Sequence, residues 1–130
     1  MDKKALEARL RWLGIYSEYY YRKELKPLGQ MLKDGEELNC VLTGVHEANR
    51  KLLAVTDRRL ILIFSALGGG DFKVIRRDAV KDWRFEKKWM FSRLSFRTSG
   101  ERFLLTNTQG ARKDLFAWAM ERPLPESEIN

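Results

Sequence analysis

Histidine and cysteine are scarce in this sequence, with one residue of each among 130. A single cysteine excludes an internal disulfide, and the two residues together cannot supply the four ligands of a structural zinc site. Cys40 lies in an apolar, strand-like stretch and is predicted to be a buried, inert thiol. His46 stands beside Glu47 in a predicted turn, where a solvated histidine is expected rather than a catalytic one. We therefore predict a protein that is not an enzyme and that uses no metal and no cofactor.

Long hydrophobic runs are also missing. The run at residues 60–64, like every other in the sequence, is far shorter than the roughly 18 apolar residues of a membrane-spanning helix. The N-terminus begins Met-Asp-Lys-Lys and lacks the apolar block and cleavage site of a secretory signal. We therefore expect the protein in the cytoplasm, with peripheral attachment at the inner membrane face left open. The run Gly68-Gly69-Gly70 is followed by a strand-like segment rather than by Lys-Ser/Thr and a helix, which favours a flexible connection over a phosphate-binding loop.

The first part of the sequence has the apolar spacing of a helix. Apolar and aromatic residues recur every three or four positions between residues 3 and 25, and Pro27 is expected to end the helix near Lys26. An apolar content of 44% over 130 residues fits one compact domain with short appendages. We assign residues 1–34 to an N-terminal helical arm, residues 35–123 to the main domain and residues 124–130 to a frayed tail.

The middle of the chain changes to short strand-like runs separated by turn residues, which is typical of a small antiparallel sandwich or barrel. The run at residues 60–64 is apolar on both sides, so a further layer must cover its outer face, and the arm is the obvious candidate. Helical spacing returns at residues 111–120, with Thr108 as the expected cap. The predicted strands span residues 37–43, 51–56, 59–65, 72–76, 80–86, 90–98 and 101–106.

Three short motifs carry a resemblance to a known family. They are Leu32-(x)3-Glu36 before the first strand, the predicted hairpin at residues 53–61 with its Thr-Asp-Arg-Arg-Leu turn, and Ile75-(x)4-Val80. On these residues the segment 32–122 resembles the bacterial pleckstrin-homology-like (GRAM-like) domains. The resemblance implies a mainly β fold: a partly open barrel of about seven antiparallel strands, capped by a C-terminal α-helix and preceded here by the helical arm.

The resemblance also has implications for the last helix and for the function. It implies that Leu115 and Trp118 of the last helix close one end of the barrel. Folds of this kind host lipid, peptide and protein binding, and sometimes assembly alone. Members that bind phosphoinositides typically carry basic residues at the end of the first strand and the start of the second. Arg50 and Lys51 occupy the second position, but the first strand has no basic residue, which weakens a lipid-headgroup interpretation.

The net charge of +7 favours anionic partners. Basic residues interleaved with aromatic ones could contact an anionic membrane surface or single-stranded nucleic acid, although the same alternation is expected of an ordinary solvated sheet. The candidate anion-binding residues are Arg50, Lys51, Arg84, Lys87, Lys88 and Arg93.

Aromatic side chains are unusually frequent on the arm, and Trp12, Tyr16, Tyr19 and Tyr20 are the candidate interface residues. They could pack on the protein's own barrel or form a seam with a second copy or another protein. Our leading hypothesis is a non-enzymatic module that binds protein or associates with itself. The alternatives are a peripheral membrane adaptor that binds anionic lipid and a protein that binds single-stranded nucleic acid.

Overall fold

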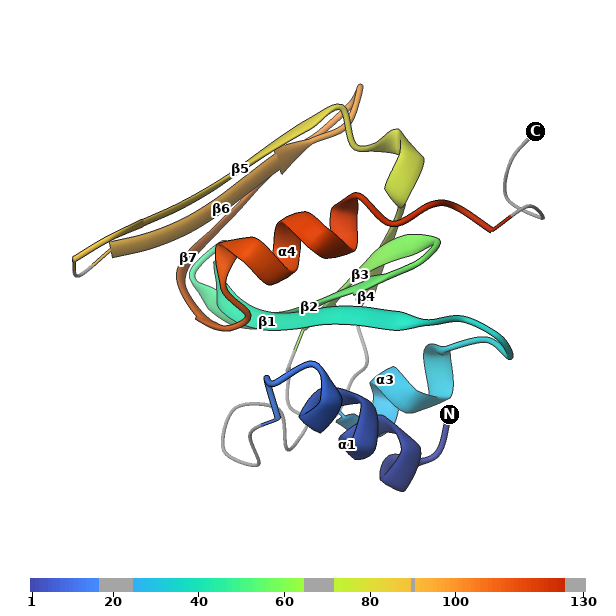
Figure 1. Cartoon of the computed structure of the whole chain (residues 1–130). Helices are drawn as coiled ribbons and strands as arrows, with labels where there is room; N and C mark the ends of the chain where they lie inside the picture. The colour runs from blue at the N-terminus through green and yellow to red at the C-terminus, as the bar shows by residue number, and fades with distance from the viewer. Residues whose placement is uncertain (17–24, 65–71, 90, 126–130) are drawn as a thin grey trace.

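The computed structural model describes residues 1–16, 25–64, 72–89 and 91–125. It contains one seven-stranded antiparallel sheet, in the order β4-β3-β2-β1-β7-β6-β5, which curls around helix α4 without closing (Figure 1). The mainly β, partly open barrel with a C-terminal helix is thus confirmed. The strands are β1 (Leu38–His46), β2 (Asn49–Thr56), β3 (Arg59–Phe64), β4 (Phe72–Arg76), β5 (Asp82–Lys88), β6 (Phe91–Arg97) and β7 (Arg102–Gly110). The helices are α1 (Lys3–Trp12), α3 (Leu25–Met31), the 3-10 turn η1 (Arg77–Ala79) and α4 (Lys113–Met120).

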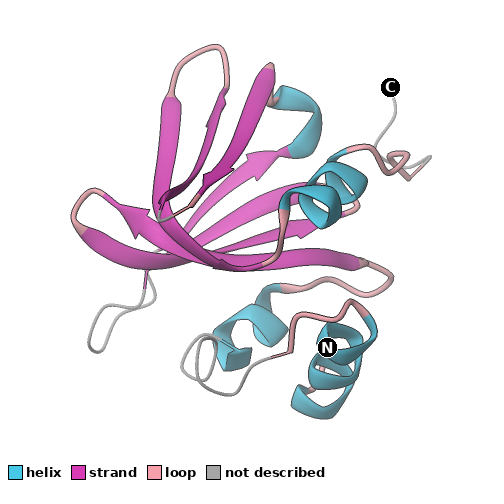
Figure 2. Ribbon diagram, turned by 60° about the vertical axis from the view of Figure 1, so that its left-hand side comes forward, coloured by secondary structure: helices cyan, strands magenta, loops and turns pink. Residues whose placement is uncertain are grey.

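The first three strands are buried on both faces. Cys40, Val41 and Leu42 follow one another along β1 and each is fully buried, although successive side chains of a strand point to opposite faces. Helix α4 covers the concave face, and α1 with α3 lies against the other face (Figures 1 and 2). Arg9 of α1 ties this outer layer to the sheet, because its Nε donates to the Leu38 carbonyl at 2.7 Å. The described part of the arm thus contacts the sheet at β1, while its cover over residues 60–64 stays a prediction.

The arm differs from the single helix predicted over residues 3–25, and that prediction is wrong. Helix α1 ends at Trp12, and Gly14 follows with a φ of +77°, a left-handed conformation that glycine adopts without the penalty of a Cβ atom. A second helix, α3, contains Pro27 at its third position. Proline is tolerated in the first turn of a helix because the N–H groups there have no partner within the helix. Among the described residues, no helix is long and apolar enough to span a membrane.

The C-terminal helix also begins later than expected. Thr108 lies within β7 rather than capping the helix, and its N–H donates to the Ser92 hydroxyl at 2.8 Å. Phe116 and Ala119 are the fully buried residues of α4, whereas Leu115 and Trp118 are only partly buried. Phe116 contacts Trp83 edge-on, with ring centroids 5.0 Å apart, so it is the central plug of the open barrel. The sequence pattern identified the right helix, and Leu115 and Trp118 do pack against the core, but Phe116 rather than Trp118 is its central residue.

Three of the motif residues, Glu36, Thr56 and Arg59, form one polar cluster around the buried Glu36. Arg59 makes a bidentate ion pair with Glu36, in which Nε donates to Oε2 at 2.9 Å and Nη2 donates to Oε1 at 3.0 Å. The Thr56 hydroxyl donates to Glu36 Oε2 at 2.7 Å, and the Lys33 N–H donates to Oε1 at 3.0 Å. Burial would raise the pKa of the Glu36 carboxyl, but these hydrogen bonds outweigh it and hold the pKa below its ordinary value of 4.5. The cluster joins the end of α3 to the β2–β3 turn.

Candidate functional site

Strand β5 is one end of the sheet. It pairs with β6 over all seven of its residues and has no strand on its other side. Among the described residues, no backbone hydrogen bond reaches that free side. Because an unpaired strand edge presents a row of N–H and C=O groups, it is a template for another strand.

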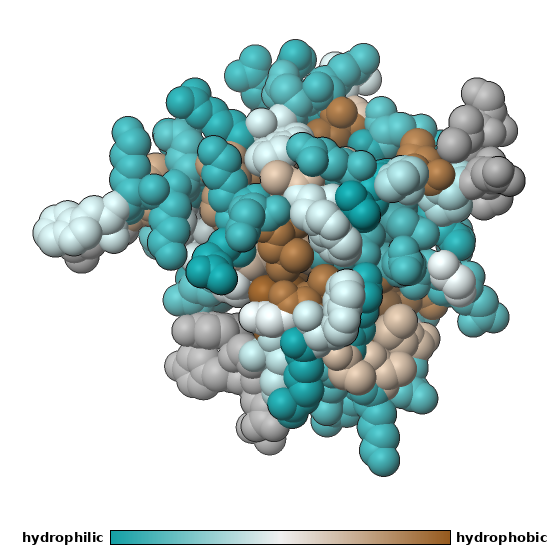
Figure 3. All heavy atoms as spheres, in the orientation of Figure 1, coloured by the Kyte–Doolittle hydropathy of each residue, from teal (hydrophilic) through white to brown (hydrophobic). Residues whose placement is uncertain are grey.

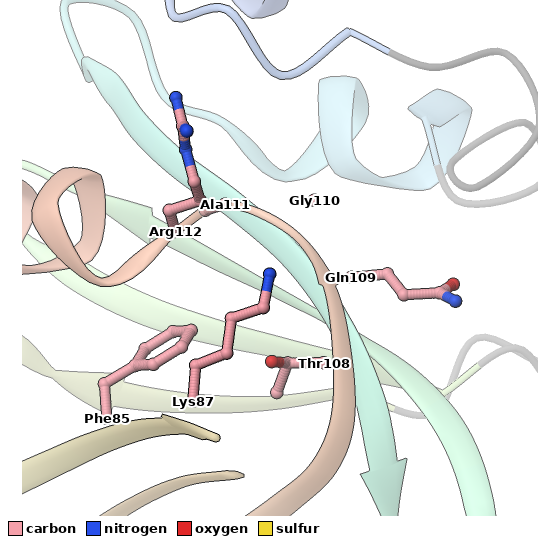
Figure 4. Close-up of a pocket in the computed structure, with 7 residues that line it drawn as sticks. All are labelled: Phe85, Lys87, Thr108, Gln109, Gly110, Ala111 and Arg112. Atoms are coloured by element: carbon pink, nitrogen blue, oxygen red, sulfur yellow. The ribbon is translucent and has the colours of Figure 1, made fainter. Parts of the chain in front are cut away.

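A hollow of about 600 Å³ runs beside this edge. Its floor is partly apolar, since Trp83 and Phe85 pack against Phe116 of α4. A second hollow, of about 230 Å³, adjoins it and shares Phe85 and Lys87 (Figure 4). The first hollow is lined by Trp83, Arg84, Phe85, Glu86, Lys87, Lys88 and Lys113, and the second by Phe85, Lys87, Thr108, Gln109, Gly110, Ala111 and Arg112.

Cations make up four of the seven residues that line the larger hollow and two of the seven that line the smaller one. In Figure 4, the Lys87 side chain points from β5 toward the end of β7 where α4 begins. Among the described residues, Lys87, Lys88, Arg112 and Lys113 take part in no ion pair. The nearby acid, Glu86, is already held by Arg84 at 2.8 Å. These lysines and Arg112 therefore keep their charge available for an external anionic group.

The tip of the β5–β6 hairpin carries exposed aromatic surface. Trp89 is 96% exposed and follows directly after Lys87 and Lys88. Phe91 is 40% exposed, with the Arg93 guanidinium 5.0 Å from its ring centroid. An exposed tryptophan beside two lysines offers a partner both apolar and cationic contact.

The candidate cations fall into two groups. Arg84, Lys87, Lys88 and Arg93 lie together on the β5–β6 hairpin, whereas Arg50 and Lys51 lie on β2, with β1, β7 and β6 between. Arg50 donates to the Thr43 hydroxyl at 3.1 Å, and Lys51 is 5% exposed with its Nζ 3.8 Å from Glu47 Oε2. The structure therefore does not bring the six predicted residues into one surface.

The candidate interface residues of the arm have mixed positions. Trp12 is 69% exposed beneath the Arg9 guanidinium, and Tyr16 is half-buried beneath that of Arg11. Tyr19 and Tyr20 lie outside the described residues. A third hollow, of about 330 Å³, separates the end of α1 from α4. Figure 3 shows apolar side chains exposed in the hollowed region over α4, ringed by hydrophilic ones.

Two residues of the cation-lined hollows, Arg112 and Lys113, were missed by sequence reasoning. The sequence signal was a pair of adjacent cations at the start of the last helix, but only the fold brings that helix start beside β5. Among the residues that the structure describes, no three histidine, cysteine or acidic side chains cluster as metal ligands would. Burial raises the pKa of the Cys40 thiol, so this residue is the inert thiol that was expected.

The family follows from a match to the model of the bacterial PH (pleckstrin-homology) domain, which covers residues 32–115. The chain belongs to the bacterial PH domain family. This assignment confirms the resemblance drawn from Leu32, Glu36 and the Thr-Asp-Arg-Arg-Leu turn. Domains of this family commonly mediate protein or lipid binding.

Solved structures similar to this bacterial PH domain are themselves PH domains. One is a protein of the DUF1696 family with a pleckstrin-homology domain from Shewanella loihica, with 22% identity, coverage of 72% of this chain and 84% of that one, and a TM-score of 0.45. Another is the Vps36 N-terminal PH domain, with 19% identity, coverage of 72% and 83%, and a TM-score of 0.47. No curated protein matches the chain.

Proposed function

We propose that this bacterial PH domain is a non-enzymatic protein-binding module that pairs an extended segment of its partner with the free edge of β5. The observation that carries the proposal is the open edge itself, with a hollow of about 600 Å³ beside it. In strand addition, main-chain hydrogen bonds provide affinity and alternate side chains provide specificity. Trp83, which is only partly buried, provides apolar contact for a partner side chain, while the cations select carboxylates.

The arm is a weaker choice of working surface. Its apolar residues Leu6 and Leu10 are fully buried against the protein's own core. Helix α1 already contacts β1 through Arg9, and β1 is paired on both sides by β2 and β7, so the part of the sheet beside the arm has no free edge for a partner strand. The free edge of β5, rather than the arm, is therefore the proposed binding surface.

The test uses a synthetic extended peptide that alternates acidic and β-branched residues, with a peptide of alternating lysine as the control. Two-dimensional NMR of the full chain should show chemical-shift changes at β5 and the start of α4 with the acidic peptide alone. The double variant Lys87→Glu, Lys113→Glu should lose this binding, while Lys4→Glu, a matched exposed change on α1, should keep it. Equal shifts with both peptides, or shifts spread away from β5, would refute the proposal.

A second candidate function rests on Trp89. Tryptophan favours the membrane–water interface, and each lysine near an anionic membrane surface contributes about 1 kcal/mol. We propose as the alternative that the hairpin tip, with Lys87 and Lys88, attaches to anionic membranes. Vesicles of phosphatidylserine and phosphatidylcholine should then blue-shift the fluorescence of the wild type relative to Trp89→Phe, and pure phosphatidylcholine should not. A single-stranded oligonucleotide in the same assay tests the nucleic-acid alternative through its salt dependence.

A further inference from the structure

The charges along β5 specify a partner strand. The outward-facing residues of β5 are Asp82, Arg84, Glu86 and Lys88, which alternate in sign at every second position. An antiparallel strand that complements them must present, in its own direction, an acid, a base, an acid and a base at the same spacing. The sequence of β5 has this order itself.

We propose that the partner is a second copy of this chain, whose β5 pairs antiparallel with β5 across a two-fold axis at Phe85. This register places Asp82 of one copy opposite Lys88 of the other and Arg84 opposite Glu86. Each pair occurs twice because the interface is symmetric. The result is one continuous sheet across the two copies. The inference rests on the proposed function and names its partner.

Neighbouring registers do not share this complementarity. A shift by two residues in one direction places Glu86 opposite Glu86 and Arg84 opposite Lys88. The opposite shift places Arg84 opposite Arg84 and Asp82 opposite Glu86. Like charges directly opposite are destabilising, and a shift by one residue would exchange the faces of the strand. Among these registers the charges therefore select the one centred on Phe85, which also pairs the whole of β5.

The concave side of the same pairing is also complementary. The two-fold axis places Lys87 of one copy opposite Trp83 of the other, so a cation free of ion pairs within the described residues meets an aromatic ring. On the outward side, Lys88, which also has no ion pair among the described residues, meets Asp82 of the other copy. Lysines at a sheet edge ordinarily discourage pairing, but in this register each has a favourable opposite group.

The existing contacts of these residues are compatible with the second copy. Arg84 reaches Glu86 along the same strand at 2.8 Å, with the Arg84 side chain 77% exposed. Asp82 bonds to Arg97 on β6 at 2.5 Å, with its side chain 60% exposed. Arg84 can therefore also contact Glu86 of the second copy, and Asp82 can also contact Lys88 of the second copy, while both existing ion pairs stay intact. A single pair of strands buries little surface, so we expect a concentration-dependent dimer rather than a permanent one.

The test uses sedimentation velocity of the full chain over a range of concentrations. Arg84→Glu alone places four acids together at the centre of the seam, and Glu86→Arg alone places four bases there, so each variant should stay monomeric where the wild type dimerises. An equimolar mixture of the two restores opposite charges at every position and should dimerise. Arg102→Glu, an exposed change of the same charge on β7, should dimerise as the wild type does.

Cysteine cross-linking provides a second readout if a charge variant folds poorly. Residue 84 of one copy lies directly opposite residue 86 of the other, close enough for a disulfide. The two copies of residue 84 are only diagonal neighbours, offset by two positions, and are too far apart for one. Under oxidation, a mixture of Arg84→Cys and Glu86→Cys should therefore cross-link as a heterodimer much faster than either variant alone. The native Cys40 is buried and should not react.

The outcomes separate the inference from the function on which it rests. A wild type that is monomeric at all concentrations, or charge variants whose mixture remains monomeric, would overturn the two-fold pairing. If the acidic peptide still binds β5 in that case, the protein-binding function stands without the second copy. If the dimer forms and the peptide neither binds nor competes with it, the general peptide-binding function fails while self-pairing stands.

Discussion

Removing the Arg59 guanidinium is the sharpest test of how the fold is held together. Arg59→Met keeps the length and apolar stem of the side chain but leaves the Glu36 carboxylate without its cation. Glu36 is 4% exposed, so water cannot replace the lost contact. The substitution also removes the hydrogen bond from Nη2 to the Met31 carbonyl at 2.7 Å, which anchors the end of α3.

The expected loss is large on the scale of the whole fold. Breaking a buried ion pair by removing one partner costs about 3–5 kcal/mol, and the Thr56 hydroxyl and Lys33 N–H that still bond to Glu36 place the loss toward the lower end of this range. Small domains unfold with a free energy of about 5–15 kcal/mol. With a urea m-value of about 1.5 kcal/mol/M, a loss of about 3 kcal/mol lowers the unfolding midpoint by about 2 M.

Equilibrium urea unfolding, followed by tryptophan fluorescence and circular dichroism, measures this loss. Arg76→Met is the matched control, because Arg76 pairs with Asp78 on the surface and both side chains are largely exposed. Its midpoint should stay close to that of the wild type. If Arg59→Met shifts the midpoint no more than Arg76→Met does, the buried cluster does not stabilise the fold and the reasoning is wrong.

Three further predictions concern the core and the pH dependence. Phe116→Ala should cost about 3–5 kcal/mol in urea unfolding, because it removes the plug of the open barrel. Gly44→Ala should cost about 1–3 kcal/mol, since its Cβ would lie 2.8 Å from Leu105 Cβ; Gly100→Ala, with open space around it, is the control. The folded-state pKa of Glu36 is lowered, so its stabilisation is present above pH 4.5 and is lost as the pH falls through the lower folded value. Glu36→Gln should therefore show a smaller loss of stability than the wild type between neutral and acidic pH, and an unchanged pH profile would contradict this assignment.

Sequence reasoning found the strands well, because each one carries its own local signal. Residues 72–76 were predicted as β4 without error, and the other strands differ from their predicted bounds by a few residues. The division of the arm into α1 and α3 was missed, although Gly14 was a readable helix end. The central residue of α4 was missed because Phe116 and Trp118 are both large and aromatic, and only the shape of the barrel decides which of them is fully buried.

For the candidate site, too, some features could be predicted from the sequence and others could not. The sequence by itself determined a small antiparallel barrel with a helical plug and a basic, aromatic hairpin, because alternation, turn residues and charge are properties of neighbouring residues. Only the tertiary structure decided that Lys51 is buried, that Lys113 lies beside β5 and that the sheet ends at β5. These facts depend on which strands become neighbours, and that choice is made by the packing of the whole core rather than by any one segment.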